Sequence, residues 1–129
     1  MTNLTDYIEV VETAYETMLA YAAQGRETDA AQGRETDHFA EPSADTVPSE
    51  IRILLTGLKE ALQHIQELLS DSDFRFAEVV VDDIHKVDAA LELVLAQTDL
   101  GSEIIDNLNA SIHLRAVLTD LFLVDEAEI

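Results

Sequence analysis

Apolar residues recur at three- and four-residue steps in four separate segments of this chain, the spacing that lines one face of an α-helix. This spacing predicts helices over residues 4–24, 47–70, 73–97 and 102–123. A short turn at Gly101 joins the last two, so we expect them to be antiparallel neighbours. The predicted fold class is therefore all-α, an antiparallel up-and-down helical bundle of about four helices.

The size of the chain fits a single helical domain, residues 1–129, and 47% of its residues are apolar, which is enough to build a core. It contains no cysteine, so neither disulfides nor thiolate metal sites are available to stabilise it. We therefore expect side-chain packing alone to hold the domain together.

The third predicted helix has two local features. Residues 71–73, Asp-Ser-Asp, are predicted to separate this helix from the one before it and to cap its first turn. The run Val79-Val80-Val81 favours a strand by itself, but Glu78 and Asp82 continue the helical period on either side. The segment is accordingly predicted to stay helical.

Residues 22–37 consist of the octapeptide AAQGRETD, repeated once without a change. Eight residues turn a helix by about 80° beyond two full turns, so a continuous helix would present the second copy on another face. We predict that Gly25 ends the first helix and that a long loop, about 25–45, carries the repeat and Pro42. A duplicated contact motif is the functional alternative.

The charge of the chain is strongly unbalanced, with 27 acidic and seven basic residues and a formal net charge of -20. The seven cations are scattered rather than clustered, which argues against direct binding of nucleic acid. Repulsion from anionic lipids, the lack of a long uncharged apolar window and the lack of a basic leader argue against a membrane role. We expect a cytoplasmic protein.

Three explanations of the acidity stay open. With only two lysines, Lys59 and Lys86, the composition resembles that of halophile proteins in style. The other two are mimicry of nucleic-acid charge and a surface that meets a basic protein partner.

Histidines are the first candidates for a metal site, and the chain has four, His38, His64, His85 and His113. Glu60 precedes His64 by four residues and Asp82 precedes His85 by three, so each pair can share a helix face. Ferritin-like di-iron proteins use paired Glu-x-x-His motifs, and this chain contains none. The prediction is solvated histidines and no metal ligands.

Acidic pairs are the second candidates. Glu9-x-x-Glu12 and Glu103-x-x-Asp106 are similar to the magnesium motifs of all-helical nucleotide pyrophosphohydrolases, but roughly ninety residues separate them. They are predicted to be solvated. No Gly-x-Ser-x-Gly elbow or serine paired with a base occurs. We therefore predict no enzyme activity, no catalytic or cofactor-binding residues and no cofactor.

Two further features concern packing. The three tyrosines of the first helix, Tyr7, Tyr15 and Tyr21, are predicted either to pack or to line a groove at an interface. Residues 117–124, VLTDLFLV, contain six apolar residues in eight, wider than one helical stripe. This segment is either buried in the chain's own bundle or a subunit contact, and the latter predicts a homodimer.

From Thr46 onward, the order of a proline-containing helix, an acidic turn, a helix, a glycine turn and a further helix resembles the layout of flagellin export chaperones. That resemblance implies binding of a helical client. The function predicted first is a non-enzymatic acidic helical protein-protein interaction module, a homodimer. The alternatives are, in order, a nucleic-acid-mimicking inhibitor, a carboxylate and histidine metal-binding bundle, and a secretion-chaperone-like binder.

Overall fold

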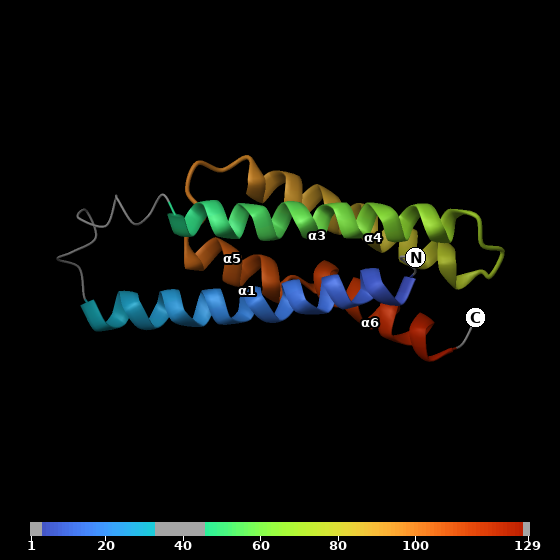
Figure 1. Ribbon diagram of the computed structural model, residues 1–129, viewed down its shortest axis with the longest axis horizontal. Helices are drawn as coiled ribbons and strands as arrows, with labels where there is room; N and C mark the ends of the chain where they lie inside the picture. The colour runs from blue at the N-terminus through green and yellow to red at the C-terminus, as the bar shows by residue number, and fades with distance from the viewer. Residues whose placement is uncertain (1–3, 33–45, 128–129) are drawn as a thin grey trace.

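The computed structural model describes residues 4–32 and 46–127, and within these ranges every regular element is a helix (Figure 1). The elements are α1 (Leu4–Gln32), α3 (Thr46–Ser70), α4 (Phe76–Leu95), α5 (Ser102–Ala110) and α6 (Ile112–Glu126). The predicted all-helical class is confirmed. The prediction of four helices is met only in part, because the last predicted helix is divided in two.

Helices α1 and α4 run in one direction, and α3, α5 and α6 run in the opposite direction (Figure 1). Helix α3 lies beside α1 and runs back along it, α4 returns beside α3, and α5 and α6 follow one another in the direction of α3. Helix α1 packs on both α3 and α5, whereas α6 packs mainly on α4. The described helices therefore close around one shared core.

Every described helix contributes a fully buried side chain to this core: Met18, Leu58, Ile84, Ile105 and Leu121. Burying a side chain of this size contributes roughly 1.5–3 kcal/mol relative to leaving it exposed. On α4 the buried residues follow the three- and four-residue steps expected of one helix face: Ala77, Val80, Ile84, Val87, Leu91 and Val94. No helix in the described ranges combines the length and apolar character needed to cross a bilayer.

The first helix is longer than predicted. Helix α1 continues through Gly25 to Gln32, so the prediction that it ends near residue 24 is wrong. One internal glycine costs a helix only about 1 kcal/mol relative to alanine, and the alanines of both repeat copies are the strongest helix formers. The first copy of the octapeptide is therefore helical, and the rest of the predicted loop, 33–45, lies outside the described residues.

The predicted helix over 102–123 is interrupted at Ser111, so the prediction of one continuous helix is wrong. Ser111 has an extended backbone (φ -59°, ψ 133°), and its hydroxyl oxygen accepts a hydrogen bond from the His113 N–H at 3.1 Å. Serine favours such a cap over a helix interior, because its side chain competes for nearby backbone amides. Helix α6 begins after this cap and continues to Glu126.

The start of α4 also differs from the prediction. Arg75 precedes the helix with helical backbone angles (φ -63°, ψ -34°) and makes no side-chain cap, so residues 71–73 do not cap it. Instead, the N–H groups of Ala77 and Glu78 donate to the carbonyls of Phe74 and Arg75, both at 3.1 Å. A tight turn therefore satisfies the amides that a capping aspartate would have served.

Candidate functional site

His64 on α3 contacts Tyr7 on α1 and Glu67 on its own helix. Its ring stacks on that of Tyr7 on α1, with centroids 4.9 Å apart and planes inclined by 14°. Its Nδ1 lies 3.7 Å from Oε1 of Glu67, the acid one turn further along α3. An exposed pair of this kind contributes about 1 kcal/mol or less, so His64 serves mainly as a packing partner of Tyr7.

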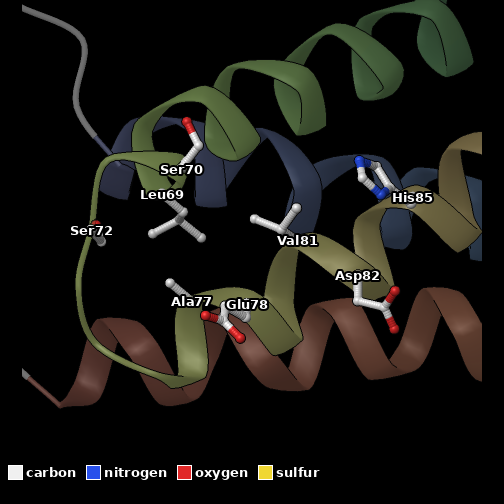
Figure 2. Close-up of a pocket in the computed structure, with 8 residues that line it drawn as sticks. All are labelled: Leu69, Ser70, Ser72, Ala77, Glu78, Val81, Asp82 and His85. Atoms are coloured by element: carbon white, nitrogen blue, oxygen red, sulfur yellow. The ribbon is translucent and has the colours of Figure 1, made fainter.

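The second predicted pair, Asp82 and His85, lies on the rim of a shallow hollow between the end of α3 and the start of α4 (Figure 2). The hollow has a volume of about 350 Å³ and is lined by Leu69, Ser70, Ser72, Ala77, Glu78, Val81, Asp82 and His85. Figure 2 shows the side chains of Asp82 and His85 pointing away from one another. Oδ2 of Asp82 instead lies 3.4 Å from Nζ of Lys86. The pair is therefore not brought together as two ligands.

Across the part of the chain that the structure describes, no group of three or more histidine, aspartate and glutamate side chains is placed to hold a metal ion. Glu9 and Glu103, which begin the two predicted acidic pairs, are exposed. A hard cation needs several convergent oxygens, and these helices do not supply them within the described ranges.

The tyrosines of α1 pack against the core from its edge. The hydroxyl of Tyr21 donates a hydrogen bond to the carbonyl oxygen of Leu100 at 2.6 Å, and burial raises the pKa of this tyrosine. This contact fixes α1 to the turn before α5. The structure thus favours the packing role over an interface groove for Tyr7, Tyr15 and Tyr21.

Two cations of α3 hold α4 in place. The guanidinium of Arg52 donates to the carbonyls of Leu95 at 2.9 Å and Thr98 at 3.0 Å, and also to that of Gln97. These carbonyls lie at the end of α4 and in the turn that follows, where no N–H group of a next helical turn is available to bond them. The arginine therefore acts as a side-chain cap supplied by a neighbouring helix.

Lys59 completes the link between α3 and α4. Its Nζ lies 2.6 Å from Oδ1 of Asp88 and 3.4 Å from Oε2 of Glu92. The hydrogen bond to Asp88 is the main reason that the pKa of Lys59 is raised. Both cations are therefore engaged by oxygen atoms of α4 and of the turn that follows it.

A pair of aspartates lies between α4 and α6. Asp120 is 9% exposed, and its Oδ2 is buried without a hydrogen-bond partner among the described residues. Burial first, and then the hydrogen bond to Asp83 and the charge of that carboxylate, raise the pKa of Asp120 to about 7. Nζ of Lys86 lies 3.7 Å from Oδ1 of Asp83. Sequence periodicity gave no sign of this pair.

The apolar segment 117–124 divides between core and surface. Val117, Leu121 and Val124 are buried, whereas Phe122 and Leu123 are 41% and 55% exposed. One side of the segment therefore packs in the chain's own bundle, and the other side faces outward.

The outward side belongs to a larger apolar surface that we call the α4–α6 face. It comprises Val79, Lys86, Ala90 and Leu93 on α4 and Ile112, Ala116, Thr119 and Leu123 on α6. Both sets follow helical spacing and lie on the solvent side of the Asp83–Asp120 contact. A hollow of about 430 Å³ runs along α6, lined by Ala110, Ile112, Arg115, Ala116, Thr119 and Asp120.

The side chains at one end of the α4–α6 face are unusually open to solvent. Leu93 is 66% exposed and Ile112 is 74% exposed. Leu93 lies ten residues beyond Asp83, and Ile112 lies eight residues before Asp120 on an antiparallel helix. At 1.5 Å per residue both are roughly 12–15 Å from the aspartate pair in the same direction, so they flank one seam.

In comparisons with known proteins, no family model, no curated protein and no solved structure matches this chain.

Proposed function

We propose that this protein is a non-enzymatic helical interaction module that associates with a second copy of itself through the α4–α6 face. The observation that carries the proposal is the pair Leu93 and Ile112, which leave most of their apolar surface in water on two adjacent helices. Val79 and Leu123 repeat this exposure at the other end of the seam, at 45% and 55%. Large apolar side chains exposed together on adjacent helices are typical of association sites.

The shape and charge of the α4–α6 face both favour pairing with itself. The small side chains Ala90 and Ala116 lie between the larger apolar residues, which lets another helix approach closely. Lys86 lies beside Asp83 and Arg115 lines the hollow along α6, so cations are present here although the chain as a whole carries a formal charge of -20. A two-fold dimer brings the same patch together twice, so a patch of mixed charge minimises repulsion between copies.

The alternative of a nucleic-acid mimic rests on net charge alone, whereas self-association rests on named exposed side chains. The metal-binding alternative has no support from the described residues, because they bring no three ligand groups together. The secretion-chaperone alternative rests on layout alone.

The test is the solution mass of the full chain, measured by sedimentation equilibrium at low and high salt. We expect a dimer that tightens as salt screens the repulsion between copies. Leu93→Asp and Ile112→Asp should each weaken dimerisation by about tenfold or more, because each places a new charge inside the contact. Leu19→Asp on α1 is the matched control, since Leu19 is also exposed, at 51%, and lies outside the face.

The wild-type mass and the control decide the outcome. A monomeric wild-type chain at both salt concentrations would refute the proposal. So would equal weakening by Leu19→Asp, because the effect would then follow from added charge rather than from the face. Circular dichroism of each variant confirms that the helices are retained.

A further inference from the structure

A second hollow lies on another side of the bundle, along the seam between α1 and α3. It has a volume of about 420 Å³ and is lined by Asp6, Glu9, Val10, Thr13, Ala14, Ile53, Leu54, Gly57 and Leu58. Ile53 is 71% exposed and Val10 is 44% exposed, so the hollow has two open apolar walls. We call this surface the α1–α3 groove.

Gly57 lies at the centre of the α1–α3 groove. A methyl group placed on it would meet no atom within 4 Å, so the missing side chain leaves the groove open at this point. The lining spans nine residues of α1, from Asp6 to Ala14, or roughly 12 Å of helix. That length matches about two turns of a bound helix, and the small residues Gly57, Thr13 and Ala14 allow a close approach.

The charge around the groove has one sign. Glu9 is exposed on the α1 side, and Glu50 and Glu60 are exposed on the same side of α3 as Ile53 and Gly57. The first 25 residues of the chain contain no lysine or arginine, and the lining residues include none. This pattern contrasts with the α4–α6 face, which carries cations of its own.

The acidic residues around the groove indicate what kind of partner can bind there. A second copy docking by the same surface would oppose acids with acids, which costs free energy. No stretch of this chain supplies a basic amphipathic helix, because its seven cations are scattered among 27 acids. An amphipathic helix of another protein, with lysine or arginine beside an apolar stripe, complements both the walls and the rim.

We infer that the α1–α3 groove is a docking site for a basic amphipathic helix of a partner protein. The apolar stripe of the partner lies over Val10, Ile53 and Gly57, and its cations lie toward the acids on either side. This site is distinct from the α4–α6 face, so a homodimer presents two such grooves.

The inference is tested with a fluorescent synthetic peptide of about 18 residues, long enough to form a helix, with leucine at positions i, i+3, i+4 and i+7 and lysine beside them. Binding to the full chain is measured by fluorescence anisotropy. One control peptide has the same composition with the leucines scattered, and another has glutamate in place of lysine. We expect the designed peptide to bind most tightly, and its affinity to fall with salt.

Two matched substitutions locate the binding. Ile53→Lys places a cation in the groove wall, and Leu19→Lys places one on α1 outside the groove lining, at a residue that is 51% exposed. We expect about tenfold weaker binding for Ile53→Lys and less than about threefold for Leu19→Lys. The inference is overturned if the wild-type chain does not bind the peptide, if the scattered peptide binds equally well, or if both substitutions weaken binding alike.

Discussion

The carboxyl group of Asp120 on α6 faces that of Asp83 on α4, and this neighbour adds to the effect of burial in raising the pKa of Asp120. Burial is the main cause and raises the pKa of Asp120 to about 7, because a desolvated carboxylate is less stable than the neutral acid. In the folded protein Asp120 therefore keeps its proton to a higher pH than it does in the unfolded chain. The stability of the α4–α6 interface therefore depends on pH in the neutral range.

Stability is predicted to fall as the pH rises toward 7. Between the ordinary pKa of 3.8 and the folded value of about 7, the native Asp120 keeps a proton that the unfolded chain has lost. The free energy of unfolding therefore decreases through this window, and Asp120→Asn removes that dependence because the amide never ionises. At about pH 8 we expect Asp120→Asn to raise the free energy of unfolding by about 1–3 kcal/mol. Urea denaturation at about pH 5.5 and about pH 8 measures both effects.

The control for this prediction is Glu126→Gln, which also removes one negative charge from α6 but at an exposed position. It accounts for the general relief of self-repulsion in so acidic a chain. Equal pH slopes for Asp120→Asn and the wild type would show that the aspartate pair does not hold the proton.

Replacement of Arg52 by lysine is predicted to lower the free energy of unfolding by about 1–2 kcal/mol. A lysine has a single ammonium group and cannot span the carbonyls of Leu95, Gln97 and Thr98 that the guanidinium joins. Urea denaturation measures the loss, and Arg75→Lys, at an exposed position before α4, serves as the matched control. If both substitutions have equal effects, the cap on α4 contributes nothing.

Gly57→Ala is expected to stabilise the protein by about 0.5–1 kcal/mol. Alanine is the better helix former, and its methyl group meets no atom within 4 Å at this position. Gly101→Ala is the contrasting variant, because Gly101 precedes α5 in an extended conformation and gains nothing from helix propensity. Thermal unfolding followed by circular dichroism compares the two, and a destabilised Gly57→Ala would mean that the glycine is needed for packing.

Removal of the hydroxyl in Ser111→Ala is predicted to cost about 1 kcal/mol, because the His113 N–H loses its acceptor. Ser111→Asn should retain most of the stability, since asparagine is also a good N-cap. Chemical denaturation of the three chains gives the comparison. Identical stability of Ser111→Ala and the wild type would indicate that packing of α5 and α6 alone sets the break.

The buried faces of the helices could be predicted from the sequence because burial follows helical periodicity. The stripe of α4 is the clearest case, and it includes Val80 within the run of three valines that favours a strand locally. Helix ends were harder. Glycine and serine both favour helix ends, yet Gly25 lies inside α1 and Ser111 separates α5 from α6. The helix propensity of the neighbouring residues and the packing of the helix decide whether such a residue is tolerated or ends the helix.

The polar contacts between helices could not be predicted, because they depend on how the helices are aligned against one another. Asp83 and Asp120 lie 37 residues apart, and only the packing of α4 on α6 brings them together. The one available signal was an acid at position 120 inside the apolar segment 117–124. His64 shows the converse, since its neighbours are Tyr7 and Glu67 rather than the acid that spacing suggested.

The interruption at Ser111 gives the two halves of the last segment different anchors, since α5 packs mainly on α1 and α6 mainly on α4. Opening of one half then does not require release of the other. We expect native-state hydrogen exchange to resolve two cooperative blocks on either side of this residue, so that α6 loses its amide protection while α5 still keeps its own.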